Sequence, residues 1–152
     1  MRFVTLALLV LATSTASARD LALVSNKSNA LTVMTMPDLV KVCKGQLSRW
    51  PDGKPVTFIM RNPALPQMRL VLEKVYGLPK EDVNTLIVTA NHGRANHPAI
   101  VVVDSDDALV QQVENTVGAV GLVDVYSITG GVKVVKLAGK LPLEPGYPLH
   151  GN

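Results

Sequence analysis

SRWPDGKPVTFIMRNPALPQMR, residues 48–69, places a turn, a strand and a proline-broken loop in direct succession. Residues 50–53, Trp-Pro-Asp-Gly, fit a type I turn, which favours proline at its second position and glycine at its fourth. Residues 54–61, KPVTFIMR, are rich in β-branched and aromatic side chains, which predicts a buried strand that ends at Arg61. We expect Trp50 to pack over the entry of this strand, the alternative being a place at a partner interface.

A helix is predicted after the loop. Met68, Leu72 and Val75 recur at helical spacing within residues 65–76, and Gly77 follows as a stop signal. This spacing puts the apolar side chains on one face, which would pack on the sheet. The start of the helix would lie beside the end of the preceding strand.

Two further helices are predicted from their terminal residues. Residues 37–43 begin with proline and an acid, which suit a helix start, and Gly45 would end that helix. Ser105 is placed to cap residues 106–116, whose acids lie in the first turn where the helix dipole favours them. Residues 80–88 fit either a helix or a strand.

Apolar runs indicate four more strands, over residues 21–25, 98–105, 118–127 and 132–137. The tail, residues 141–152, holds too many prolines and glycines for a regular element. Strands that alternate with helices imply an α/β fold with a mostly parallel or mixed sheet and helices on both faces. No internal repeat or linker interrupts this pattern, so we expect one domain.

The first eighteen residues have the pattern of a secretory signal peptide. Arg2 precedes the apolar stretch FVTLALLVLA, and small residues end at Ala18. Cleavage there would leave 134 of the 152 residues as an α/β domain over 19–152. We predict a periplasmic or secreted protein without membrane insertion after cleavage, because the apolar core is short for a transmembrane span. An uncleaved anchor is the alternative.

Composition excludes several classes of function. Cys43 is the one cysteine, so no intramolecular disulfide is possible, and its apolar surroundings predict a small buried side chain. The formal net charge of +3 falls to +2 once Arg2 is removed, and the basic residues are scattered. With two phenylalanines, three tyrosines and one tryptophan, no stacking platform for bases is expected. We therefore predict no binding of nucleic acid.

Catalytic and metal motifs are weak or missing in the sequence. His92 and His97 share a loop, but clustered further zinc ligands are not evident, so solvent-facing histidines are the favoured interpretation. Residues 104–107, Asp-Ser-Asp-Asp, lack the glycine and distal glutamate of a calcium loop and suit helix capping. No serine nucleophile elbow, P-loop or dinucleotide fingerprint occurs. We predict neither an enzyme nor a cofactor.

The order of these segments resembles the phosphate-binding protein of the phosphate ABC importer, in the type II periplasmic binding protein superfamily. The matching stretches are DLVKVCKGQLSRW at residues 38–50, the strand that ends in Arg61, and a helix that carries Arg69. VDSDDALVQQVENTVGAVGLVDV follows at residues 103–125, and GYPL near the end is similar to the ending of small secreted members with a PBP-like domain. The resemblance covers residues 21–150.

This resemblance implies an exported solute-binding domain, built like one lobe of that fold, that binds phosphate or another small oxyanion and serves a transporter. Arg61 would bind the anion, since a guanidinium and the free N–H groups of a helix start both attract oxyanions. Asn62 and Arg69 complete the candidate ligand-binding set. The alternatives are a structural or surface ion pair for Arg61 and a helix cap for Asn62.

Two departures from the family pattern support other hypotheses. Where the family places a Ser-Gly-Thr group after the arginine, residues 62–67 read NPALPQ, and Pro66 removes one N–H donor. The segment that would build most of the first lobe is also missing. The second hypothesis is a periplasmic interaction or structural module that binds no small ligand. In a third, two chains pair as a homodimer to complete the cleft.

Overall fold

Strands and helices alternate along the chain in the computed structural model, which describes residues 19–151. The predicted signal peptide, residues 1–18, lies outside the described residues. The strands are β1 (Leu21–Asn26), β2 (Val33–Met34), β3 (Thr57–Arg61), β4 (Ile100–Val103), β5 (Ala119–Asp124) and β6 (Val132–Leu137). The α-helices are α1 (Met36–Cys43), α2 (Arg69–Val71), α3 (Lys80–Asn91) and α4 (Asp106–Asn115). Short 3-10 turns form η1 (Pro66–Met68) and η3 (Val125–Ser127), and η2 (Leu72–Tyr76) is a π-helical turn.

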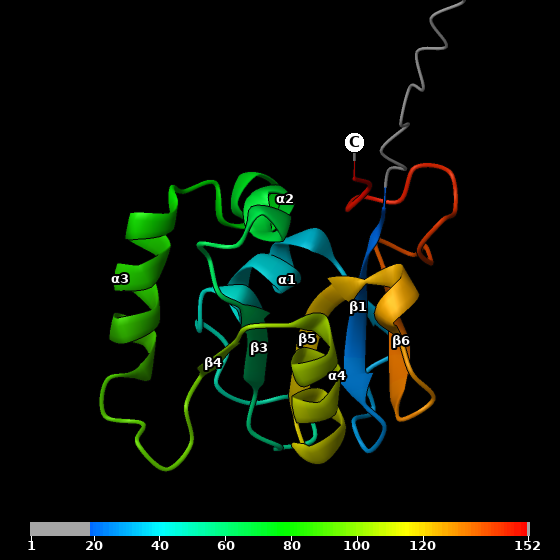
Figure 1. Ribbon diagram of the computed structural model, residues 1–152. Helices are drawn as coiled ribbons and strands as arrows, with labels where there is room; N and C mark the ends of the chain where they lie inside the picture. The colour runs from blue at the N-terminus through cyan, green and yellow to red at the C-terminus, as the bar shows by residue number, and fades with distance from the viewer. Residues whose placement is uncertain (1–18, 152) are drawn as a thin grey trace, which may run out of the picture.

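The strands form one sheet in the order β2-β6-β1-β5-β3-β4 (Figure 1). β3 pairs in parallel with β4 and β5, and β2 pairs in parallel with β6. β1 runs antiparallel to both of its neighbours, β5 and β6. The sheet is therefore mixed, with β1 opposed to the other strands, which confirms the predicted α/β class.

Helices cover both faces of the sheet, because successive side chains of a strand point to opposite faces. Val120 and Leu122 of β5 join the larger apolar core with α1, η2 and α3, whereas Val123 joins the core beneath α4. Gly121 allows α4 to approach closely, since a Cβ at this position would lie 2.7 Å from Leu109 Cδ2. Figure 1 shows α4 in front of the sheet and α1 behind it.

The predicted turn before β3 is present. The backbone N–H of Gly53 donates to the carbonyl of Trp50 at 2.9 Å, which closes the turn. The Trp50 side chain is 8% exposed, and its Nε1 donates to the carbonyl of Gly118 at 2.9 Å. Trp50 therefore packs in the core and links the entry of β3 to the entry of β5, which confirms its packing role.

The helix predicted over residues 65–76 is confirmed with a mixed geometry. η1, α2 and η2 follow one another from Pro66 to Tyr76, and Gly77 ends the segment with φ +61°. A π-helical last turn is wider than an α-helical one, which the apolar spacing does not reveal. The ambiguous residues 80–88 lie in α3 and are helical.

Both predicted helix starts carry side-chain caps. Thr35 Oγ1 accepts from the N–H of Asp38 at 3.2 Å before α1. Ser105 Oγ accepts from the N–H of Ala108 at 3.1 Å before α4.

β2 was not among the predicted strands, because a strand of two residues is too short to show an alternation of apolar and polar side chains.

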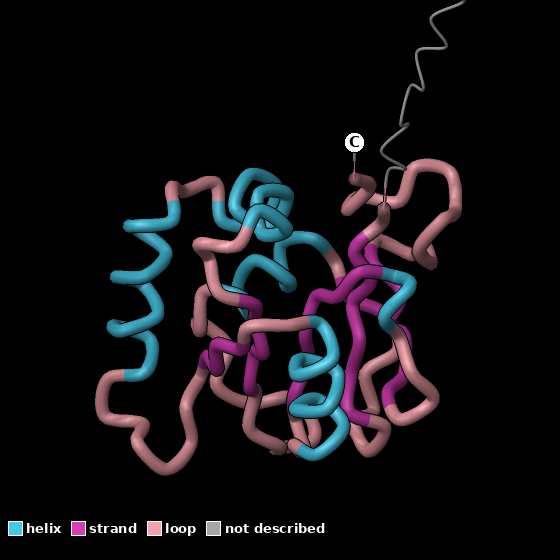
Figure 2. Tube along the Cα trace, in the orientation of Figure 1, coloured by secondary structure: helices cyan, strands magenta, loops and turns pink. Residues whose placement is uncertain are grey.

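The tail after β6 is irregular, as predicted, and Figure 2 draws it as loop. Hydrogen bonds attach it to β1. Tyr147 is buried, and its hydroxyl donates to the carbonyl of Leu21 at 2.7 Å. The N–H of Leu21 in turn donates to the carbonyl of Leu149 at 3.0 Å. The tail therefore secures the first residue of β1.

Within residues 19–151, no helix combines the length and the apolar character needed to cross a membrane.

Candidate functional site

A pocket of about 720 Å³ opens where β3, β4 and β5 end. These three strands are parallel, so their carboxyl ends meet at one edge of the sheet. Ligands of open α/β sheets characteristically bind beyond the carboxyl ends of the strands. Arg19, Arg61 and Arg69 are the arginines of the wall, and its carboxylates are Glu73, Asp104, Asp106 and Asp124.

Arg61 lies at the floor of this pocket and is 4% exposed. As the last residue of β3 it points toward α4, where its Nη1 lies 3.0 Å from Asp106 Oδ1. Its Nη2 donates to the carbonyl of Gln67 at 3.4 Å. The buried Nε has no hydrogen-bond partner among residues 19–151. Arg61 thus forms the structural ion pair foreseen as an alternative and keeps one N–H unused.

Asp106 begins α4 and faces Arg61 across the pocket floor. Ser127 Oγ donates to its Oδ2 at 3.3 Å. Its Oδ1 accepts no aligned hydrogen bond in the described part of the chain, because the contact with Arg61 is close but poorly directed. The first N–H groups of a helix lack intrahelical acceptors, and their partial positive charge attracts anions. Arg61 and the start of α4 therefore combine into a positive corner that Asp106 partly neutralises.

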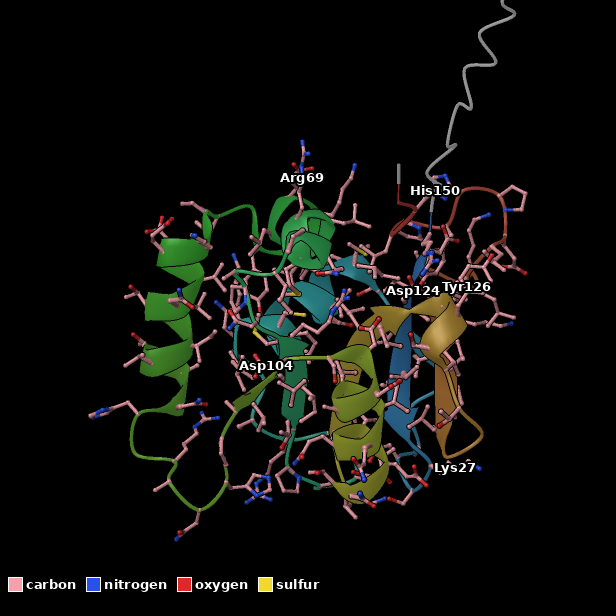
Figure 3. All side chains as sticks on the ribbon, viewed as in Figure 1. Lys27, Arg69, Asp104, Asp124, Tyr126 and His150 are labelled. Carbon is pink, nitrogen blue, oxygen red and sulfur yellow. The ribbon has the colours of Figure 1, made fainter. Side chains whose placement is uncertain are left out.

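Arg69 lies at the rim and points away from the body of the protein (Figure 3). Its side chain is 85% exposed, and its Nε lies 3.1 Å from Glu73 Oε1, one helical turn further on. Arg61 and Arg69 therefore both line the pocket, with Arg61 buried at its floor and Arg69 exposed to solvent at its rim.

Asn62 lies outside the set of residues that line the pocket. Its Oδ1 accepts from the N–H of Ala64 at 3.0 Å, and its backbone N–H donates to Val103 at 2.8 Å. Leu65 occupies the cap position of η1 and makes no side-chain capping bond. The capping role foreseen for Asn62 is therefore wrong, because Pro63 and Ala64 separate it from the helix by a short turn.

Arg19 and Asp124 are charged residues of the wall that were not predicted from the sequence. Arg19 Nη1 lies 3.2 Å from Asp124 Oδ2, and its guanidinium stacks 5.5 Å from the centre of the Tyr126 ring. Figure 3 shows Asp124 and Tyr126 side by side at the end of β5. Arg19 and Asp124 are 105 residues apart in sequence, so no local pattern could have paired them.

The pocket wall carries three arginines and four carboxylates, so one carboxylate has no arginine partner. Each of the three arginines has a carboxylate partner within 3.2 Å. Asp104, directly after β4, is exposed and forms neither a hydrogen bond nor an ion pair through its side chain within residues 19–151. The formal charge of the wall is therefore −1 with all acids ionised.

The other chemically reactive side chains lie elsewhere. His97 Nε2 lies 3.5 Å from Thr57 Oγ1, and His92 is the C-cap of α3. No group of three or more histidines, cysteines or acids suited to a metal occurs in the part of the chain that the structure describes. Cys43 is buried, as predicted, and burial raises the pKa of its thiol well above the usual value.

No protein-family model matches the sequence, and no curated protein matches it significantly. Solved structures do match. An ABC-type phosphate transport receptor from Vibrio cholerae aligns with 22% identity and a TM-score of 0.72, over 88% of this chain and 54% of the receptor. A phosphate ABC transporter substrate-binding protein with bound phosphate, from Clostridium perfringens, aligns with 17% identity and a TM-score of 0.70, over 88% and 53%.

PstS from Borrelia burgdorferi aligns with 15% identity and a TM-score of 0.68, over 90% of this chain and 56% of PstS. The chain thus spans about half the length of the solved structures that it matches. At these identities the likeness concerns the fold. The chain has the fold of one lobe of a periplasmic binding protein. Of the solved proteins named here, one is a phosphate transport receptor and another is a phosphate ABC transporter substrate-binding protein.

Proposed function

We propose that the protein is an exported solute-binding domain that holds phosphate, or a related small oxyanion, in the pocket at the carboxyl ends of β3, β4 and β5. The observation that carries this proposal is the buried guanidinium of Arg61, which has an unused Nε–H and lies beside the start of α4. The named activities of the solved proteins, which are receptors and substrate-binding proteins, support a role in binding without catalysis.

The energetics of Arg61 favour an anionic ligand. A buried N–H without an acceptor costs about 1–3 kcal/mol, which an oxyanion would recover by accepting from it. The Nε is shielded from solvent in the present conformation, so the ligand would reach it after a small turn of the guanidinium. Hydrogen bonds between guanidinium and oxyanion are charge-assisted and strong. The free N–H groups at the start of α4 would add to them.

Asp106 would select among oxyanions. Its Oδ1 lacks an aligned donor and faces the same corner of the pocket. A protonated oxyanion, such as hydrogen phosphate, can donate a hydrogen bond to this carboxylate. Sulfate is fully ionised at neutral pH and would only be repelled. We therefore expect phosphate to bind more tightly than sulfate.

Thermal unfolding tests the proposal, because a ligand that binds only the native state raises its apparent stability. The full chain would be exported by its host, purified in its processed form, and unfolded with and without millimolar phosphate or sulfate. We expect a higher melting temperature with phosphate, and little change in the Arg61→Lys variant, which keeps a charge but loses the planar fork. Arg49→Ala, at an exposed arginine outside the pocket, is the matched control. Equal melting temperatures with and without phosphate would refute the proposal.

Export itself is part of the proposal and rests on residues 1–18. The basic residue, apolar core and small residues of this segment support cleavage after Ala18. N-terminal sequencing of the protein from the periplasm or medium should begin at Arg19. A protein recovered only from the cytoplasm, with Met1 in place, would exclude export and a transporter partner.

A second candidate function is an interaction module, and a specific surface favours it. Tyr126 is 70% exposed and Leu143 is 63% exposed. Asp20 joins the two segments, because its carboxylate accepts from the N–H of Leu143 and its carbonyl accepts from the N–H of Val125, the residue before Tyr126. An exposed tyrosine beside an arginine is typical of interface hot spots. The partner would be a second copy or another exported protein.

Native mass spectrometry with and without the Tyr126→Ala substitution tests this second function. A dimer that the substitution dissociates would support the interaction module in its homodimeric form. A protein that stays monomeric at high concentration, and that responds to phosphate, would leave solute binding as the sole function.

A further inference from the structure

We propose that the ligand of this pocket is larger than inorganic phosphate and is a zwitterion, a phosphate monoester or phosphonate that carries a primary ammonium group. The inference rests on the proposed function and names its substrate class. It follows from three observations: the volume of the pocket, the charge left over on its wall, and the position of that charge relative to Arg61.

The volume exceeds what a phosphate ion fills. The pocket measures about 720 Å³, and volumes of about 300–1,000 Å³ are typical of sites that enclose organic molecules of drug size. Leu21, Leu65 and Leu70 contribute apolar surface to the wall. A ligand with a short carbon chain between its charged ends would cover this surface.

The charges of the wall call for a cation as well as an anion. An oxyanion at Arg61 adds negative charge to a wall whose formal charge is already −1. The surplus belongs to Asp104, which has no ion-pair partner within the described residues. A phosphate ion would leave Asp104 unpaired and would be repelled by it. A zwitterion would supply the oxyanion for Arg61 and the ammonium for Asp104 in one molecule.

The fold places the two groups at neighbouring strand ends. Arg61 ends β3 and Asp104 follows β4, and the register pairs Arg61 with Val103. Asp104 therefore comes one residue beyond the partner of Arg61, and both residues line the same pocket. Asp104 is exposed and Arg61 is buried, so the phosphate end would enter first and the ammonium end would remain near the mouth.

Isothermal titration calorimetry of the processed full chain, with four ligands, tests the inference. The ligands are O-phosphoethanolamine, glycerol 3-phosphate, inorganic phosphate and ethanolamine. Glycerol 3-phosphate controls for size without the ammonium, and ethanolamine supplies the ammonium without the phosphate. We expect O-phosphoethanolamine to bind about fivefold more tightly than glycerol 3-phosphate, the ratio given by one partly solvated charge pair.

The Asp104→Asn substitution assigns the preference to one carboxylate. It should remove the advantage of O-phosphoethanolamine over glycerol 3-phosphate and should raise the affinity for inorganic phosphate, because the repelling charge is gone. Asp82→Asn is the matched control, since Asp82 is an exposed aspartate in the first turn of α3 and does not line the pocket. The control variant should retain the preference.

Three results would contradict the inference, and they have different consequences. If inorganic phosphate binds as tightly as O-phosphoethanolamine, the ligand class is wrong and the proposed oxyanion site stands. If none of the phosphorus ligands binds, both proposals fall. A preference for O-phosphoethanolamine that persists in Asp104→Asn would also contradict the role of Asp104.

Discussion

Two arginines of the pocket make nearly the same contact in opposite surroundings. Arg61 lies 3.0 Å from Asp106, with side chains that are 4% and 20% exposed. Arg69 lies 3.1 Å from Glu73, with side chains that are 85% and 58% exposed. The distances alone would rank the two ion pairs as equal. Burial separates them, because water screens and competes for the exposed pair and scarcely reaches the buried one.

This comparison bears on function as well as stability. An exposed guanidinium gains little from a ligand, since water already satisfies its N–H groups. The buried Arg61 has an N–H that water does not reach, so an oxyanion would supply a hydrogen bond that is now missing. The following predictions extend the contrast between buried and exposed positions, starting with the largest expected effect.

Substitution of two glycines should give the largest contrast. Gly118 has φ +84°, and a Cβ there would lie 1.9 Å from the carbonyl oxygen of Pro55. Gly118→Ala should therefore destabilise the protein by at least about 4 kcal/mol, through a clash and backbone strain together. Gly53 has a similar φ of +89° but open space around it, so Gly53→Ala should cost only about 1–2 kcal/mol. Urea unfolding measures both, and equal losses would contradict the packing described at the start of β5.

Removal of the buried guanidinium should have the next largest effect. Arg61→Met leaves the carboxylate of Asp106 without its partner and should cost about 3 kcal/mol in the free energy of unfolding. The double variant Arg61→Met, Asp106→Leu should recover most of that loss, because no uncompensated charge remains. Chemical denaturation of the single and double variants gives the coupling energy. A double variant as unstable as Arg61→Met would mean that packing, rather than the ion pair, accounts for the loss.

A third contrast concerns two tyrosines at alkaline pH. Burial raises the pKa of Tyr76 above the usual 10.0, so the folded state keeps a proton that the unfolded state releases. The contribution of Tyr76 to the free energy of unfolding is therefore fully present below pH 10. Above pH 10 it falls by about 1.4 kcal/mol per pH unit. Tyr76→Phe should flatten this decline between pH 10 and 11 in thermal unfolding curves. Tyr126→Phe, at an exposed ring, is the control and should leave the decline unchanged.

Removal of the exposed ion pair should have the smallest effect. Arg69→Ala should change the free energy of unfolding by no more than about 0.5 kcal/mol, as exposed pairs one helical turn apart usually do. It should also leave most of the phosphate-dependent rise in melting temperature. A loss of that rise in Arg69→Ala, with Arg61→Lys unaffected, would move the anion site from the floor of the pocket to its rim.

Local sequence signals predicted much of this fold. The turn at Trp50, the strand that ends in Arg61 and the cap at Ser105 each depend on residues a few positions apart, and all three are present. The mixed geometry of residues 66–76 was beyond such signals, because 3-10, α and π turns share nearly the same apolar spacing.

The site was less predictable than the fold. Arg61 could be singled out because it ends a strand and precedes a helix. Its partner Asp106 was interpreted as a helix-start acid, which is correct but incomplete, since the pairing depends on how α4 crosses the sheet. Arg19 and Asp124 meet only because β1 and β5 are neighbours in the sheet. Contacts of this kind follow from topology and leave no local pattern.

The most direct test of the central claim is an NMR titration of the processed protein with phosphate, following the Nε–H signals of the arginine side chains. We predict that the Arg61 Nε–H signal shifts with saturation, together with the backbone amides of Asp106 and Asp107, while that of Arg69 scarcely moves. This result would place the oxyanion at the floor of the pocket, beside α4. An Arg61 signal that stays unchanged at millimolar phosphate would contradict the account.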